Sequence, residues 1–174
     1  MLYTGHGDAG YTHVIGGPAL PKCDARLEAL GALDEAQAHL GLARALIGTP
    51  WTTAIQRVQT DLRALMGAIA TMPADNYSPA FSGDHQCALE ADLSCWDRRT
   101  GGFSGFVTPG DSVFCAHLHL ARTVIRRAER TIVGLSRQDH QIDPRILSYL
   151  NRLSSWVYAL TLVIDLPADL PASM

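Results

Sequence analysis

The sequence predicts an all-α protein, namely a five-helix antiparallel bundle with a glycine-rich loop at its N-terminus. Apolar residues recur at spacings of three and four in four long segments and one shorter segment, which is the period of an amphipathic helix. Short connections separate these segments, and short connections favour antiparallel neighbours. No segment alternates convincingly between apolar and polar residues, so we expect no strand. A length of 174 residues fits a single domain over residues 1–174.

The first two helices have clear start and stop signals. Asp24 is the predicted N-cap of the first helix, and Pro50 lies just beyond its end. The apolar stripe of this helix consists of Leu33, Ala36, Leu40, Ala43 and Ile47. The second helix carries its stripe over residues 55–72 and stops at Pro73, because proline lacks the N–H that a helix interior needs.

Three further helices follow. A shorter one is expected over residues 85–98. The helix over residues 111–136 has the clearest stripe, and Asp111 or Ser112 can cap its start. The last helix begins after Pro144. The first twenty residues hold five glycines and no helical period, so we expect them to form a loop that crosses the end of the bundle.

Charge and hydropathy exclude two broad classes of protein. The net charge is −3 and the pI is near 6.1, whereas a general nucleic-acid binder is basic. No apolar run approaches the roughly 20 residues of a membrane-spanning helix. The N-terminus lacks the basic start and apolar core of a secretory signal. We therefore expect a cytoplasmic protein that has neither nucleic acid nor a membrane as a partner.

Neither the cysteines nor the histidines have metal-ligand spacing. The four cysteines form no CxxC pair, and we interpret them as reduced and mostly buried: Cys23, Cys87, Cys95 and Cys115. His117 and His119 are two residues apart, so their side chains point about 200° apart on a helix. We expect no metal site.

The helix over residues 111–136 is unusually cationic. Four guanidinium groups and one carboxylate fall within nine residues: Arg122, Arg126, Arg127, Glu129 and Arg130. Like charges four residues apart disfavour a helix, so something should compensate them. Carboxylates of a neighbouring helix, with Asp34 and Glu35 as candidates, could do so, and so could an anionic ligand. The alternative is a solvated face with surface ion pairs.

Residues 4–12 form a second candidate anion site. They read TGHGDAGYT and combine three glycines with hydroxyl side chains. Such a loop can turn backbone N–H groups onto phosphate oxygens. It follows no predicted strand and opens no helix, so it is neither a Walker A loop nor a Rossmann turn. Lys22, the single lysine, could add a point charge to the same anion.

Five segments in order resemble one family. They are YTGHGDAGYTHVIGG, K-x₃-R-x-EALGALDE, FVTPGD, LARTVIRRAER and YLNRLSS. On these motifs the chain resembles the trimeric ATP:cob(I)alamin adenosyltransferases of the propanediol-utilisation type. The resemblance spans almost the whole chain.

The resemblance implies a fold, an assembly and a reaction. It implies a five-helix bundle in a homotrimer, with ATP and Mg²⁺ bound between the N-terminal loop of one subunit and the arginine helix of its neighbour. Cob(I)alamin is the implied substrate, whose cobalt attacks C5′ of ATP and expels triphosphate. A reductase, or a cobalamin-dependent enzyme that accepts the product, is the implied further partner.

The resemblance also implies roles for individual residues. It indicates four catalytic residues: Arg126, Glu129, Arg130 and Asp34. Of these, it implies that Asp34 pairs with Arg126 across the subunit interface. It indicates ATP- and corrin-binding positions, of which the last is the aromatic beneath the corrin: Thr4, Gly7, Asp8, Gly10, Thr12, Lys22, Arg26, Asn151 and Phe106.

The departures from the family concentrate in the loop. The family loop usually reads TRTGDKGTT, so two cations and two hydroxyls are replaced here by Gly5, Ala9, His6 and Tyr11. Ser155 stands where the family has an aspartate. The imidazole of His6 and the phenol of Tyr11 suit acid–base catalysis, so one alternative is an enzyme that uses the same intersubunit pocket for a different small molecule. The other alternative is a corrinoid-binding protein without catalysis.

Overall fold

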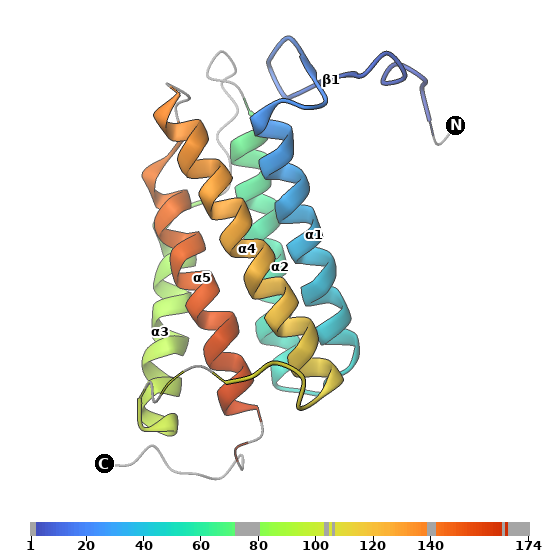
Figure 1. The fold of residues 1–174 in the computed structure, drawn as a ribbon. Helices are drawn as coiled ribbons and strands as arrows, with labels where there is room; N and C mark the ends of the chain where they lie inside the picture. The colour runs from blue at the N-terminus through green and yellow to red at the C-terminus, as the bar shows by residue number, and fades with distance from the viewer. Residues whose placement is uncertain are drawn as a thin grey trace.

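The protein is a bundle of five helices preceded by a short hairpin (Figure 1). The computed structural model describes residues 3–71, 81–102, 105, 107–138, 142–164 and 166. The elements, in chain order, are β1 (Tyr11–His13), β2 (Ala19–Pro21), α1 (Ala25–Ala45), α2 (Trp51–Ala70), α3 (Gly83–Thr100), α4 (Val113–Arg137) and α5 (Pro144–Val163). The predicted all-α, five-helix class is confirmed. Phe106 lies outside the described residues.

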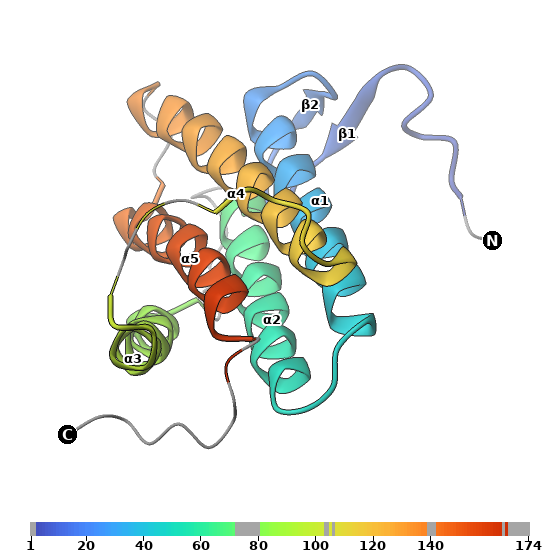
Figure 2. The same cartoon turned by 60° about the horizontal axis from the view of Figure 1, so that its bottom comes forward.

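Helix α4 has a central place in the bundle. It packs against α1 on one side and α5 on the other, while α2 packs on α1 and α3 packs on α5 (Figure 2). One apolar core runs between the helices, and its largest fully buried side chains include Trp156, Tyr149 and Leu33. None of the helices in the described ranges combines the length and hydropathy that a membrane span requires.

The helix starts follow from local side-chain chemistry. The Asp24 carboxylate accepts from the Arg26 N–H at 2.8 Å, as expected for an N-cap. Ser112 rather than Asp111 caps α4, because its hydroxyl accepts from the Cys115 N–H at 3.1 Å. Helix α3 begins two residues earlier than predicted, since Ser82 and His85 form a reciprocal capping box.

The expectation of no strand was wrong for the N-terminal segment. The strand β1 pairs antiparallel with β2, and Thr12 lies opposite Leu20. Each strand has only three residues, which is too short for an alternating pattern to show in the sequence. Backbone pairing holds the hairpin instead, and the Ile15 N–H donates to the Ala70 carbonyl at 2.9 Å, which fixes the hairpin to the end of α2.

Candidate active site

The arginines of α4 divide between two sides of the helix. Arg127 forms an ion pair with Glu35 of α1, one of the carboxylates expected to compensate the cationic helix. Arg126 and Arg130 are exposed. Together with a carboxylate, an amide and one apolar side chain, they border a cavity of about 310 Å³, here called the arginine cavity: Arg126, Glu129, Arg130, Val133 and Asn151. The Asn151 amide donates to Glu129 Oε1 at 3.3 Å, so α4 and α5 bring four of the predicted site residues together.

A larger cavity of about 600 Å³, here called the apolar cavity, lies between α3, α4 and α5. Its walls include Leu93, Ala159 and Leu162, and hydroxyl or charged groups surround them: Ser94, Asp97, Thr100, Arg122, Arg126, Ser154, Ser155 and Tyr158. Apolar walls with a few polar groups are typical of a ligand site. Arg126 borders both cavities, so ligands in the two would meet at its guanidinium.

The glycine-rich segment folds into consecutive turns around Lys22. The Asp8 N–H donates to the Gly5 carbonyl and the Gly10 N–H to the Gly7 carbonyl, each at 3.1 Å. The Lys22 N–H donates to the Gly10 carbonyl at 2.8 Å. The ammonium of Lys22 lies so close to Gly7 that a Cβ there would be 2.9 Å from Nζ, so only glycine fits without displacing the lysine. Lys22 therefore lies against the loop, and its role as a charge that binds the same anion stays a prediction.

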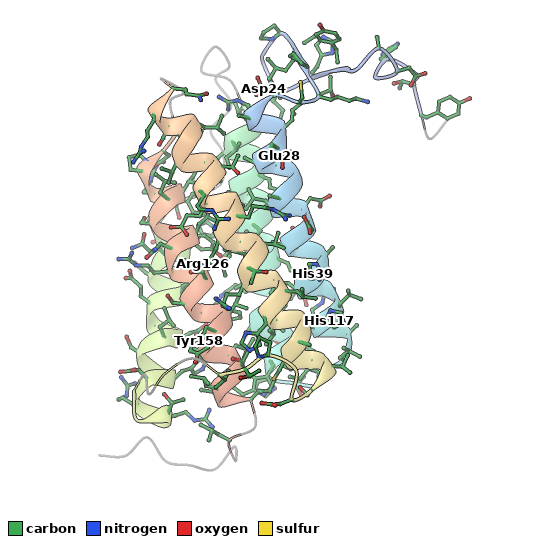
Figure 3. The ribbon with its side chains drawn as sticks, in the orientation of Figure 1. Asp24, Glu28, His39, His117, Arg126 and Tyr158 are labelled. Atoms are coloured by element: carbon green, nitrogen blue, oxygen red, sulfur yellow. The ribbon has the colours of Figure 1, made fainter. Side chains whose placement is uncertain are left out.

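The loop and the arginine helix do not meet within one chain. No residue of the segment 4–22 borders either cavity. Figure 3 shows the N-terminal segment leaving from the end of α1 marked by Asp24, whereas Arg126 lies near the middle of the bundle. Asp34 is exposed on α1 and makes no ion pair within the described part of the chain. The two halves of the predicted site are therefore presented on separate surfaces.

Arg26 has a different setting from the other predicted phosphate ligands. Its side chain is only 4% exposed, and its guanidinium donates to the Ile69 carbonyl near the C-terminus of α2. Burial lowers the pKa of Arg26, and the neighbouring Asp24 carboxylate partly offsets this. In this structure Arg26 joins α1 to α2, and its role in phosphate binding stays a prediction.

His6 and Tyr11, the acid–base pair of the alternative reading, are both exposed. Neither borders a cavity. The backbone N–H of His6 donates to the hydroxyl of its near neighbour Thr4 at 3.4 Å. No contact in the described residues places the imidazole and the phenol around a common substrate.

One cavity residue escaped the sequence analysis. Tyr158 of α5 is buried beside the apolar cavity, and its hydroxyl donates to the Gly105 carbonyl at 2.5 Å. The ring of His119 packs edge-on against it, with centroids 6.3 Å apart. From its sequence, a tyrosine within an apolar helix is predicted to be a core residue. Its hydrogen-bond partner lies 53 residues earlier in the chain, so no local sequence pattern indicates this bond.

None of the cysteines, and none of the histidines in the described ranges, borders either cavity. The expectation of mostly buried cysteines was wrong, because Cys23, Cys87 and Cys95 are exposed and only Cys115 is buried. The three exposed cysteines lie outside the apolar stripes of the helices, so the helical period does not place them in the core. His117 faces His39 of α1 with ring centroids 6.2 Å apart, whereas His119 points toward α5. Within the described ranges, no group of three or more ligand-type side chains could hold a metal ion.

Comparison with known proteins agrees with this geometry. The model of the family described as cobalamin adenosyltransferase matches residues 2–164. A corrinoid adenosyltransferase of Bacillus subtilis is 32% identical over 169 residues, which cover 94% of this chain and 86% of that protein. The PduO corrinoid adenosyltransferase of Citrobacter freundii is 34% identical, and this chain spans 50% of its length.

Solved structures show the same fold. A variant PduO-type ATP:corrinoid adenosyltransferase from Lactobacillus reuteri, complexed with cobalamin and ATP, superposes with a TM-score of 0.87 at 31% identity. The match covers 94% of this chain and 93% of that one. The helical bundle of this chain is thus the fold of a PduO-type corrinoid adenosyltransferase. This chain belongs to the cobalamin adenosyltransferase family.

Proposed function

We propose that the protein transfers the 5′-deoxyadenosyl group of ATP to cob(I)alamin and releases triphosphate, at a site shared between protomers of a homotrimer. The observation that carries the proposal is the position of Arg126, which borders the arginine cavity and the apolar cavity together. A nucleotide and a corrin in these two cavities meet at one cation, and that is where a negatively charged leaving group needs stabilisation.

The apolar cavity suits a corrinoid. Its volume of about 600 Å³ and its apolar walls can take part of a large, flat macrocycle. The hydroxyls of Ser94, Ser154 and Ser155 can donate to and accept from the amide side groups of a corrin. Because these walls exclude water, the electrostatic interactions of the reacting groups are stronger there than in solution.

The N-terminal loop suits the triphosphate. Its backbone amides and Lys22 can bind phosphate oxygens, and Arg130 and Arg126 of a neighbouring protomer can bind the opposite side. Mg²⁺ in nucleotide sites is held by phosphate oxygens and one or two carboxylates, and Asp8 is the carboxylate that this loop offers. Mg²⁺ would neutralise charge on the departing triphosphate.

The reaction needs positioning more than acid–base chemistry. Cobalt(I) donates its electron pair to C5′, a cobalt–carbon bond forms, and the bond from C5′ to the triphosphate oxygen breaks. The triphosphate leaves with that electron pair, so no proton transfer is required. The chain's contribution is to align cobalt with C5′ and to bind the leaving group more strongly as its charge grows.

The homotrimer is part of this proposal. The loop and the arginines are presented on separate surfaces, so a site that uses both needs two protomers. Exposed apolar side chains on α1, at its C-cap and on α4 supply a surface for association: Leu42, Leu46, Val113 and Leu120. Asp34 is exposed on the same helix α1 and available to Arg126 of another copy.

A cytoplasmic location and a redox partner complete the proposal. Cob(I)alamin is a reduced species, and the reducing cytosol is the compartment that fits it and the free cysteines. A reductase that supplies cob(I)alamin, or an enzyme that accepts the product, would therefore meet the protein there.

The direct test is an adenosylation assay with cob(I)alamin and ATP under reducing conditions. We expect conversion to the spectrum of the adenosyl form, and a loss of at least a hundredfold in kcat/KM for Arg126→Ala, about 2.7 kcal/mol or more. The matched control is Arg63→Ala, since Arg63 is exposed on α2 and borders neither cavity. Absence of conversion by the wild-type protein would refute the proposal.

A further inference from the structure

Tyr158 makes a bond that the proposed reaction does not itself require. Its hydroxyl donates to the Gly105 carbonyl at 2.5 Å, and thereby joins α5 to the segment that leads from α3 to α4. The same side chain borders the apolar cavity and is 9% exposed. Figure 3 shows Tyr158 in the lower half of the bundle, below Arg126 and beside this connecting segment.

The segment joined by Tyr158 is conformationally costly to fix. Gly102, Gly105 and Gly110 all have positive φ, at 90°, 137° and 126°. Glycines lose more backbone freedom on ordering than other residues, so a chain of this kind needs an anchor to hold one conformation. Gly102 is held to the end of α3 by a hydrogen bond to the Asp97 carbonyl at 3.1 Å, and Gly105 is held by Tyr158.

The ring of Tyr158 also contacts helix α4. The buried ring of His119 on α4 packs edge-on against the Tyr158 ring. Burial lowers the pKa of His119, and the nearby Arg122 lowers it further, against a smaller opposing effect of Asp111. The neutral imidazole of His119 therefore packs against one side of the Tyr158 ring, and the apolar cavity lies on another side.

We propose that Tyr158 is a positioning residue for the corrinoid: its hydroxyl holds the backbone at Gly105, three residues after Gly102 of the cavity wall, and so helps to set the space left for the macrocycle. This inference rests on the proposed function.

The test compares two tyrosine-to-phenylalanine variants of the same helix. Tyr158→Phe keeps the ring and removes the bond to Gly105. Tyr149→Phe is the control, because Tyr149 is a buried tyrosine of α5 whose hydroxyl donates to Asp61 at 2.9 Å and which borders neither cavity. We expect Tyr158→Phe to raise KM for the corrinoid about three- to tenfold, with KM for ATP unchanged, as loss of one neutral hydrogen bond predicts. Tyr149→Phe should leave both constants unchanged.

Hydrogen exchange supplies a second readout that does not depend on activity. Amides of the peptide covering residues 101–110 should exchange faster in Tyr158→Phe than in the wild type, and at the wild-type rate in Tyr149→Phe. Equal exchange in all three proteins would overturn the inference, and so would equal corrinoid KM. A wild-type protein that adenosylates nothing would refute the proposed function instead, while faster exchange in Tyr158→Phe would still identify the anchor.

Discussion

Asp61 is the one carboxylate buried among the described residues, and it shows how a single charged group is accommodated in this core. It accepts a hydrogen bond from the Tyr149 hydroxyl at 2.9 Å, and His85 Nε2 lies 3.7 Å from its other oxygen. Burial raises the pKa of Asp61, and the hydrogen bond and His85 only partly offset this. Burial also raises the pKa of Tyr149, so its phenol stays a donor.

The raised pKa of Asp61 has a consequence for stability. The folded protein binds this proton more tightly than the unfolded chain, so the free energy of unfolding falls as pH rises above the ordinary range of an aspartate, near 3.8. Asp61→Asn removes the titration, so its free energy of unfolding should depend less on pH above about 4. Urea unfolding at a series of pH values measures this. Parallel curves for the two proteins would contradict the assignment.

Ala9 and Gly5 stand where the family loop carries cations, and the backbone distinguishes between them. Gly5 has φ of 72°, which an arginine would adopt only with strain, whereas Ala9 is an exposed residue that already carries a Cβ. The change Ala9→Lys should lower KM for ATP about tenfold or more, because one charge-assisted hydrogen bond contributes about 1.5–3 kcal/mol. Initial-rate kinetics measures it, with Ala91→Lys, an exposed site on α3, as the control. If both substitutions lowered KM for ATP equally, the gain would come from the net charge of the protein and not from a contact between the side chain at position 9 and the phosphates.

At the residue scale, the spacing of residues within one helix predicted which side chains lie together. Contacts between residues far apart in the chain could not be predicted from the sequence. The cluster of Arg126, Glu129 and Arg130 follows from helical period alone, and the structure confirms that these side chains share a cavity. The bond from Tyr158 to Gly105 and the buried setting of Arg26 depend on which loops and helix ends come together. Those contacts arise from tertiary packing, which local patterns do not encode.

At the scale of elements, start signals determined how well each helix could be predicted. Asp24 and Pro144 are familiar N-terminal residues, and α1 and α5 begin where these predict. Helix α3 uses His85 in place of the usual glutamate or glutamine of a capping box, so its first turn was missed. The hairpin was missed because its three-residue strands depend on backbone pairing and on the bond to Ala70.

The cap of α4 matters most, because this helix carries the arginines. Ser112→Ala removes the acceptor of the Cys115 N–H and should lower the free energy of unfolding by about 1 kcal/mol. Ser136→Ala is the control within the same helix, since its hydroxyl donates to the Val133 carbonyl and caps no helix start. Denaturant unfolding of both variants measures the difference. Equal losses would show that the Ser112 cap has no special role.

At the scale of the whole molecule, the bundle supplies two surfaces rather than one finished site. The helices place Arg126 between two cavities and Arg130 beside the arginine cavity, and the hairpin places Lys22 and the glycine-rich turns at the end of α1. The central claim is that a loop from one protomer and arginines from another form each active site. Within a closed three-fold ring, each protomer would then contribute to two different junctions.

Mixed assembly of two inactive variants tests this claim most directly. Lys22→Glu reverses the charge of the loop and Arg126→Glu reverses the charge of the helix, so each variant alone should have background activity. The two chains would be co-expressed with different tags and purified on both. Purification on both tags leaves only mixed trimers, and in a closed ring each of these has an intact loop against an intact arginine helix at one of its three junctions. We therefore predict recovery of about a third of wild-type adenosylation. Activity no higher than that of the two parent variants would contradict the account.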